Sequence, residues 1–398
     1  MATSKVFIYI CLSFLGGVVL NSLILVPQFF VLGFFILGLM IVAVFFVPMG
    51  HLSKGEKNKR IAVVGFCLLL FAAGVYRHQM FERPKDNLDY YQKNQSIQKV
   101  TSLRYLKDKL SESVDHSLSP PQSSLLGAIM LGETERLSYE LKGKLNRSGT
   151  RHITSISGMN IMILASLLIG LGLILGMWRG QAFYFALITI ILFIIMVGAP
   201  PSAVRAGIMG GIVLFAEKIG RLSQAQRLLV IAAAVMLAFN PLLLKFDIGF
   251  QLSFLATLGI AKLSPWFLEK FSRIPKKFEL QNVVAMTFPA VIFTAPVLAA
   301  SFGQVSVISF FTNILIVPVL GLVLALGFFA GILGIISESL GQIAFWPVWL
   351  FLTYVYKIID WSSGLPFAVM EITVFPWYLT VLYFALLWWG IKYFKLER

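Results

Sequence analysis

Long runs of residues without a single charge dominate this sequence. One run reaches from Val6 to Gly50 and another from Leu280 to Ser337. A bilayer crossing takes about 20 apolar residues, so each run is long enough for at least two crossings. Across the chain, 58% of residues are hydrophobic and 13% are charged, whereas soluble domains carry about 25% charged residues. These features exclude a soluble globular protein and predict an all-α polytopic membrane protein.

The apolar runs predict about 11 or 12 transmembrane helices, some of them broken, at about 20 residues a crossing. The predicted spans cover residues 6–26, 28–48, 61–76, 153–178, 180–204, 228–244, 248–261, 280–337, 339–356 and 372–391. The run 280–337 contains three prolines and is expected to hold two or three of these crossings. The apolar patch Leu125–Leu131 is too short to cross a bilayer.

The cations indicate the orientation of the chain. Lys54, Lys57, Lys59 and Arg60 stand in one short loop, which predicts that this loop and the N-terminus are cytoplasmic. The cationic stretches 218–227, 262–277 and 392–398 fit the same side, and residues 77–150 are expected outside. The formal net charge of +15 has two readings. It reflects cytoplasmic loops, or it attracts an anionic substrate.

We expect three segments: N-terminal spans in residues 1–78, an outer polar and amphipathic segment in 79–124, and a transmembrane channel domain in 125–398. Residues 97–118 place leucines at helical spacing, which predicts an amphipathic helix lying on the membrane. The sequence has two cysteines, Cys11 and Cys67, both in apolar runs. We expect free thiols and neither a disulfide nor a metal site. No cleavable signal peptide is expected.

Polar residues inside the apolar half are few and are therefore candidates for function. A charge in the bilayer is costly, so it usually faces a cavity or a partner. Arg205, Asp247 and Gln251 are such residues, and Asp247 and Gln251 share a helical face because they are four residues apart. Arg205 and Asp247 also fit a simpler role near the outer interface, and they could pair with each other.

His152, Ser157 and Asn160 cluster at the start of another predicted span. A single histidine in such a place is more often structural than a ligand. The sequence contains no recognisable metal-binding, phosphate-binding or nucleophile motif, so no catalytic residue and no cofactor are predicted. The cations Arg136, Lys142, Lys144, Arg147 and Arg151 precede this span. They could guide a polyanion towards a pore, or contact lipid headgroups.

Three motifs, in order over residues 125–317, resemble the ComEC family of competence proteins. The first comprises Gly132-Glu-Thr-Glu-Arg136 and Arg151-His-Ile-Thr-Ser-Ile-Ser-Gly158, and the second is Gly198-Ala-Pro-Pro-Ser-Ala-Val-Arg205-Ala. The third is Asn240-Pro241 followed by Asp247-Ile-Gly-Phe-Gln251-Leu-Ser-Phe254.

The resemblance implies a channel that moves single-stranded DNA across the bacterial cytoplasmic membrane during natural transformation. It also implies a competence DNA receptor and a cytoplasmic translocation ATPase as partners, together with membrane lipid. The candidate channel and DNA-binding residues are Arg151, His152, Ser157, Asn160, Arg205, Asp247 and Gln251. We expect Arg205 to meet phosphate or to pair with Asp247, and Asp247 to orient a broken helix.

The sequence departs from the family at three points. Asn160 stands where the family pattern usually has a second histidine. The outer segment 79–124 is too short for the complete OB-like domain that many members carry. The metallo-β-lactamase-like domain that ends many members is absent from this sequence, so any strand degradation is expected from a separate nuclease.

Two other classes of function are compatible with parts of the sequence. A secondary transporter for a small anionic solute or lipid would use broken helices at the midplane, but no inverted repeat between the halves is evident. An intramembrane enzyme would need paired carboxylates or a nucleophile with its base, and none is found. The chain is therefore not expected to be an enzyme.

Overall fold

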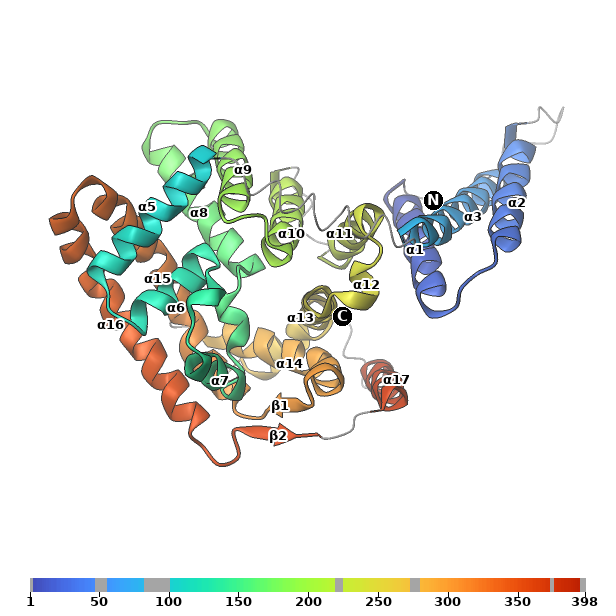
Figure 1. The fold of residues 1–398 in the computed structure, drawn as a ribbon. Helices are drawn as coiled ribbons and strands as arrows, with labels where there is room; N and C mark the ends of the chain where they lie inside the picture. Colours follow the sequence, from blue (N-terminus) through green and yellow to red (C-terminus); the bar gives the residue numbers. More distant parts are fainter. Residues whose placement is uncertain are drawn as a thin grey trace. The chain divides into compact units, whose positions relative to one another are not determined.

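A computed structural model describes residues 3–46, 56–81, 101–218, 225–272, 280–372 and 376–393 of the chain. The described residues are almost wholly helical, which confirms the predicted all-α class (Figure 1). Most of the predicted outer segment, residues 82–100, lies outside the described residues. The chain folds as two compact units, one of residues 1–93 with 215–254 and the other of residues 94–214 with 255–398. The three predicted segments stay a prediction.

The first unit is built on three N-terminal helices, α1 (Thr3–Leu23), α2 (Gln28–Phe46) and α3 (Glu56–Phe81). Helix α3 packs against both α1 and α2 (Figure 1). Two glycines allow the backbones of α1 and α3 to touch. A Cβ at Gly17 would collide with the carbonyl oxygen of Phe71, and a Cβ at Gly74 with that of Phe14. Small residues at such contacts are typical of helices that associate in membranes.

Three further elements complete the first unit. Helix α11 (Ala225–Phe239) packs against α1, and the short helix α12 (Leu243–Phe246) follows it. Helix α13 (Ile248–Lys270) begins directly after α12, and its first turns belong to this unit while the rest belongs to the second. The predicted break after Asn240-Pro241 therefore corresponds to a real interruption between α11 and α13.

The second unit begins with α5 (Thr101–Ser117), α6 (Gln122–Leu131) and α7 (Tyr139–Arg147), with short 3-10 turns at Thr134–Arg136 and Arg151–Thr154. Helix α5 is amphipathic, as predicted. Its apolar residues Leu110 and Val114 are 5% and 0% exposed, and α5 packs on α15 and α16. Protein covers this part of the apolar face, whereas Leu106 on the same face is exposed. The expected place of α5 on the membrane surface stays a prediction.

Most of α13 and seven further described helices form the rest of the second unit. The seven helices are α8 (Gly158–Ile174), α9 (Arg179–Met196), α10 (Pro201–Lys218), α14 (Leu280–Phe302), α15 (Ser309–Ile336), α16 (Glu338–Ser363) and α17 (Trp377–Tyr393), with the end of α10 assigned to the first unit. Helices α15 and α16 form a long hairpin (Figure 1). The run 280–337 thus holds two helices, the lower of the two numbers expected.

The core of the second unit joins helices that are far apart in the sequence. Fully buried side chains come from α6, α8, α15 and α16, among them Leu126, Ile161, Leu320 and Phe345. The patch Leu125–Leu131, which is too short to cross a bilayer, is part of this core. Its burial explains why a short apolar stretch stands next to the polar outer segment.

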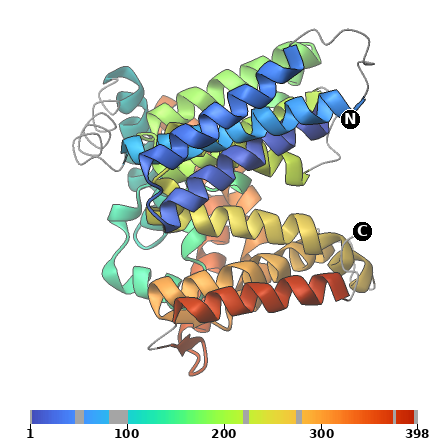
Figure 2. The same cartoon turned by 90° about the vertical axis from the view of Figure 1, so that its right-hand side faces the viewer.

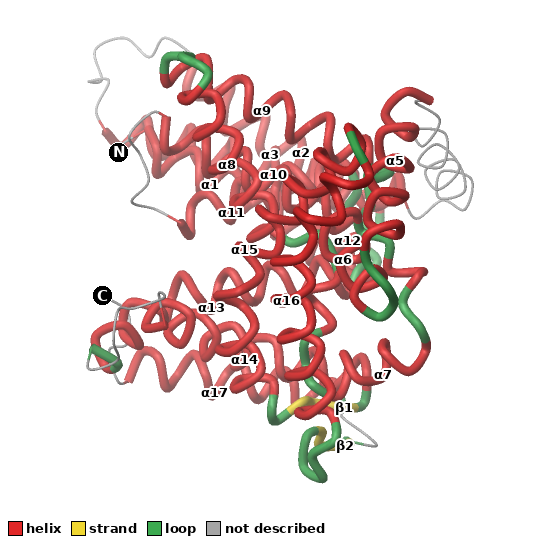
Figure 3. The backbone as a smooth tube through the Cα atoms, turned by 90° about the vertical axis from the view of Figure 1, so that its left-hand side faces the viewer, coloured by secondary structure: helices red, strands yellow, loops and turns green. Residues whose placement is uncertain are grey.

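Two short strands and a terminal helix close the unit. Strands β1 (Gln304–Ser306) and β2 (Val369–Glu371) pair antiparallel, with Val305 opposite Met370 (Figure 3). Helix α17 lies along α14 (Figure 2), where the Tyr383 hydroxyl donates a hydrogen bond of 2.9 Å to the Ile292 carbonyl. Neither strand was predicted, because a strand of three residues is too short to produce a recognisable sequence pattern.

Among the described residues, six helices are long and apolar enough to cross a membrane. They cover Lys5–Leu23, Arg60–Phe81, Arg179–Met196, Leu280–Phe302, Ser309–Ile336 and Glu338–Ser363. Shorter apolar helices cover Gln28–Val44, Gln122–Leu131, Gly158–Ile174, Pro201–Phe215 and Gln226–Phe239. These helices define a polytopic membrane protein, and the higher total of crossings stays a prediction.

Candidate channel site

The first candidate cluster lies where α8 begins. Ser157 is the N-cap residue of α8: its hydroxyl oxygen accepts a hydrogen bond of 3.3 Å from the Asn160 backbone N–H. The same hydroxyl donates to the Asn160 side-chain oxygen at 3.0 Å, and the Asn160 amide donates to the Ile129 carbonyl at 3.3 Å. Asn160 is 8% exposed. Ser157 and Asn160 therefore start α8 and fasten it to α6.

His152 and Arg151 lie just before this cap and are exposed. The Arg151 guanidinium donates a hydrogen bond of 3.2 Å to the Asn146 side chain, and the His152 carbonyl accepts one of 3.3 Å from the Ser155 hydroxyl. His152 is therefore an exposed residue beside a helix start that is fixed by other residues.

The segment in front of His152 is anchored to the distant end of the chain. The Ser306 hydroxyl donates to the Arg147 carbonyl at 2.8 Å, and the Thr312 hydroxyl donates to the Ser148 carbonyl at 2.8 Å. Gly149 has a φ of +71°, and a Cβ there would collide with Ser309. These contacts hold residues 147–149, which lead into α8, against the start of α15. The position of His152 therefore depends on this contact between the two segments.

The second candidate cluster is the turn between α9 and α10. Gly198 and Ala199 have φ values of +90° and +48°. In the part of the chain that the structure describes, Ala199 is the one non-glycine residue with positive φ, a conformation that is strained for a residue with a Cβ. Pro201 begins α10, a position where proline is favoured because its missing N–H would have no helical partner. Strained backbone of this kind often marks functional sites.

Arg205 lies on α10 one turn after this strained connection and is half-buried. The glycines of α10 pack closely on neighbouring helices: a Cβ at Gly207 would collide with Ile194, and one at Gly210 would lie 3.1 Å from Ile161. The helix that carries Arg205 is thus fixed against α9 and α8. Arg205, which follows one apolar run in the sequence, is thus an interior residue of helix α10 in the structure and does not lie in a connection between helices.

The third candidate cluster lies at the break between α11 and α13, where side chains form hydrogen bonds with the backbone. The Asn240 side-chain oxygen accepts a hydrogen bond of 3.0 Å from the Leu242 N–H. The Asp247 carboxylate accepts one of 2.9 Å from the Phe250 N–H, as an N-cap does. The Gln251 amide donates to the Leu244 carbonyl at 2.8 Å. Asn240, Asp247 and Gln251 together satisfy the backbone groups that the break exposes.

The structure brings some of the candidates together. Arg151, His152, Ser157 and Asn160 lie within one helix start of the second unit, and Asp247 and Gln251 lie at one helix break of the first. Arg205 and Asp247 belong to different units. Pairing between them therefore stays a prediction, and so does the assignment of all seven residues to a channel.

Two of the five cations that precede α8, Arg136 and Lys144, form ion pairs within the protein. Arg136 contacts Asp115 at 2.5 Å and Glu133 at 2.9 Å, and the hydrogen bonds that its guanidinium donates to the Asp115 carboxylate raise the pKa of the guanidinium. Lys144 contacts Glu140 at 2.5 Å and Asp360 at 2.8 Å, and these bonds raise the pKa of its ammonium group. Cations with such partners are poorly suited to guide a polyanion, and Lys142 and Arg151 are better candidates.

A buried polar group in the first unit was missed by the sequence analysis. Asn21 and His78 are 1% and 0% exposed, and their side-chain nitrogens lie 2.9 Å apart. The Gln79 amide donates to the Asn21 side-chain oxygen at 3.3 Å. The Arg77 guanidinium donates to the carbonyls of Ala238 and Phe239 at 2.8 and 3.1 Å, so it caps α11 beside the break. Asn21, a polar residue in an uncharged run, was the available signal.

Among the described residues, no three histidine, cysteine, aspartate or glutamate side chains are grouped closely enough to hold a metal ion. Cys11 and Cys67 are free thiols. The three candidate clusters therefore consist of residues that cap helices, residues at helix connections and the cations Arg151 and Arg205.

The fold and these clusters define a polytopic helical membrane protein with interrupted helices. The sequence model of the competence protein family matches residues 129–397, so the chain belongs to this family, as its motifs predicted. It is 29% identical over 279 residues to ComE operon protein 3 of Bacillus subtilis (strain 168), which covers 70% of this chain and 34% of that protein. The chain thus spans about a third of the length of that relative. No solved structure matches.

Proposed function

We propose that this chain forms a channel that translocates single-stranded DNA across the cytoplasmic membrane during natural transformation. The observation that carries the proposal is the family match over residues 129–397, which contains all seven candidate residues. The relative from Bacillus subtilis is named ComE operon protein 3. Membership of the competence protein family supports a role in competence, and passage of a single DNA strand through this chain is what we propose.

The helix breaks support a conduit. Interrupted helices at membrane depth are tolerated mainly where they are buried in protein or line a water-filled cavity. Among the described residues of the family region, the Gly198–Ala199 connection places a non-glycine residue at positive φ, and the Asn240–Asp247 break is closed by side chains. Single-stranded DNA is held by cations that follow its phosphates. Arg205, half-buried one turn after the first interruption, is the proposed phosphate contact.

The proposal includes partners and an orientation. The N-terminus is placed in the cytoplasm, because residues 51–60, which end near the start of α3, carry four cations. A DNA receptor supplies the strand outside, and a translocation ATPase pulls it inside. The chain itself does not cut DNA, and a separate nuclease degrades the other strand. Purified chain supplied with Mg²⁺, Mn²⁺ or Zn²⁺ should then leave DNA intact, whereas metal-dependent cleavage that persists after removal of contaminating nucleases would contradict this part.

The test is uptake of fluorescent DNA by transformable cells that lack their own member of the family. Cells that express the wild-type chain should accumulate DNA protected from external nuclease. Arg205→Ala should abolish uptake at equal membrane abundance. Arg205→Lys should restore only part of it, because an ammonium group lacks the planar fork that meets phosphate at two points. Full uptake with Arg205→Ala would remove the phosphate role, and uptake of small anions without DNA would favour a transporter.

A further inference from the structure

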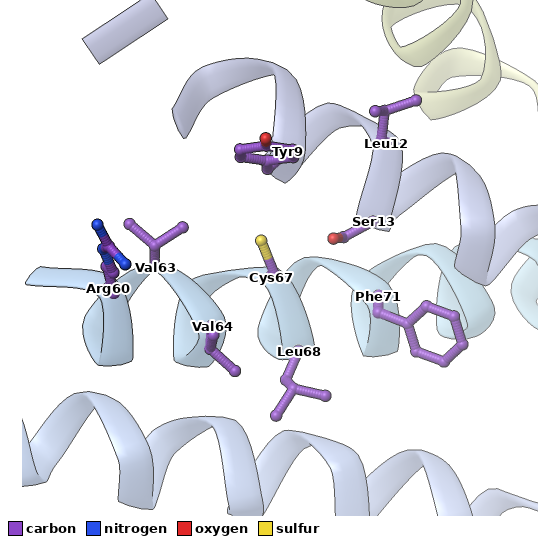
Figure 4. Close-up of a pocket in the computed structure, with 9 residues that line it drawn as sticks. All are labelled: Tyr9, Leu12, Ser13, Arg60, Val63, Val64, Cys67, Leu68 and Phe71. Atoms are coloured by element: carbon purple, nitrogen blue, oxygen red, sulfur yellow. The ribbon is translucent and has the colours of Figure 1, made fainter. Parts of the chain in front are cut away.

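A groove runs along the first unit between α1 and α3 (Figure 4). Its volume is about 640 Å³, which is within the range of about 300–1,000 Å³ typical of small-molecule sites. The residues that line it are Tyr9, Leu12, Ser13, Arg60, Val63, Val64, Cys67, Leu68 and Phe71. All of them belong to α1 and α3, so the groove is complete within one unit.

The glycine contacts explain why the groove opens where it does. Gly17 and Gly74 bring the backbones of α1 and α3 into contact in the second halves of both helices. Towards their first turns, the two helices are separated by side chains instead. There Tyr9, Leu12 and Val64 are 45%, 46% and 54% exposed. The groove therefore forms because α1 and α3 are in close backbone contact in their second halves and further apart in their first halves.

The chemistry of the groove changes along its length. Figure 4 places Arg60 at one end and Phe71 at the other, with Cys67 between them. Apart from Arg60, the α3 side of the groove consists of apolar residues and the Cys67 thiol. At 1.5 Å per residue, Arg60 and Phe71 are about 16 Å apart along α3. That length is close to one leaflet of the hydrocarbon core, which is about 30 Å thick in total.

The charge at the open end selects the headgroup. Arg60 is the charged residue that lines the groove, and it lies near the start of α3. Basic pockets beside transmembrane helices bind anionic headgroups. Arg60 is exposed at the mouth of the groove, and a guanidinium meets phosphate at two points. An apolar trough of one-leaflet length that ends in a guanidinium is complementary to a phosphate attached to an acyl chain.

We propose that the α1–α3 groove is a binding site for one anionic phospholipid. Its phosphate contacts the Arg60 guanidinium, and one acyl chain lies along Val64, Cys67 and Phe71. The lipid fills the space that the glycine-mediated crossing leaves open and thereby fixes the angle between α1 and α3. The proposal is independent of DNA translocation, because none of the lining residues belongs to the candidate channel clusters.

The experiment uses the full chain in nanodiscs that contain a trace of phospholipid with a photoreactive acyl chain. Two probes are compared, phosphatidylglycerol and phosphatidylcholine, with the same photoreactive chain. Cross-linked peptides are then mapped by mass spectrometry. The phosphatidylglycerol probe should label the stretch Val63–Phe71 about five-fold more than phosphatidylcholine, the factor corresponding to about 1 kcal/mol per basic residue at an anionic surface. The exposed face of α2, at Leu32 and Ile36, should be labelled equally by both probes.

Two variants separate the headgroup contact from the trough. Arg60→Gln should lower labelling by phosphatidylglycerol to the level of phosphatidylcholine and leave the labelling of α2 unchanged. Cys67→Phe should fill the trough and lower labelling of Val63–Phe71 by both probes. A large excess of unlabelled phosphatidylglycerol should compete for the wild-type groove. Monodisperse elution of each variant in detergent shows that the chain is folded.

Two results would overturn the proposal. Equal labelling of Val63–Phe71 by both probes, or no effect of Arg60→Gln, would mean that ordinary boundary lipid fills the groove. Chemical cross-links between the α1–α3 grooves of two chains, with little lipid labelling, would mean that a second copy covers the groove.

Discussion

Asp247 acts on the backbone of the helix that follows it. Its carboxylate accepts a hydrogen bond of 2.9 Å from the Phe250 N–H, and no charge is needed for such a cap. Serine and asparagine can supply the same acceptor, whereas alanine cannot. The cap and any role of the negative charge can therefore be separated by substitution.

Asp247→Ala should lower the free energy of unfolding by about 1 kcal/mol, because the cap of α13 is lost. Asp247→Ser should stay close to the wild type, since its hydroxyl can cap the same N–H. Chemical unfolding in detergent, followed by circular dichroism, measures both. If Asp247→Ser destabilises as much as Asp247→Ala, the charge of Asp247 matters for folding, and pairing with a cation such as Arg205 becomes the better explanation.

At the scale of single residues, motifs with local partners were the most predictable. The Asn240–Gln251 break was predicted because its members lie close together in the sequence, and helix caps act over two to seven residues. The partners of Lys144 and Arg147 were not predictable, because Asp360 and Ser363 lie about 216 residues away. The positive φ of Ala199 was also missed, since alanine rarely adopts it.

At the scale of helices, the close contact of α1 and α3 depends on glycine. Gly74→Leu should destabilise the chain by about 1–3 kcal/mol or more, because the new side chain meets the backbone of Phe14. Gly33→Leu is the matched control, since a Cβ at Gly33 meets nothing within 4 Å. Thermal stability in detergent compares the two variants. Equal melting of both would show that the tight α1–α3 contact is not needed for folding.

Lys144 links α7 to the end of α16 through Asp360. Its pKa is raised, so the stabilisation is fully present below the ordinary lysine value of 10.5 and is lost only as the pH rises through the higher folded value. Lys144→Met should cost less than about 1 kcal/mol, as partly exposed ion pairs do. The difference from wild type should stay constant between neutral pH and the ordinary lysine value.

The control for Lys144 is Lys142→Met. Lys142 stands on the same short helix, and no described residue forms an ion pair with it. This variant should unfold like the wild type at every pH. A difference between wild type and Lys144→Met that shrinks already near neutral pH would contradict the assigned pair.

The positions of the helices were easier to predict than whether lipid or protein covers their apolar faces. Uncharged runs identified the long helices because lipid demands about 20 apolar residues for each crossing. The amphipathic pattern of residues 97–118 identified α5 but not what covers its apolar face. Lipid and a protein core select the same leucines, so only the packing of Leu110 beside Gly331 distinguished the two.

At the scale of the whole molecule, the proposed orientation in the membrane rests on the four cations of residues 51–60. In a chain whose Cys11 and Cys67 are replaced, a membrane-impermeant thiol reagent added outside should label Asn94→Cys and spare Lys57→Cys. Permeabilised cells should label both and serve as the control. The reverse pattern in intact cells would invert the orientation of the first three helices.

The central claim, that DNA passes along this chain beside Arg205, is tested most directly by photo-cross-linking during uptake. A photoreactive amino acid replaces Ser202, which lies three residues before Arg205 on α10. In the control it replaces Leu192, a residue of α9 that is 45% exposed. If DNA passes beside Arg205, incoming labelled DNA should be cross-linked at position 202 and not at position 192. Normal uptake with no cross-link at position 202, or with equal cross-linking at both positions, would contradict it.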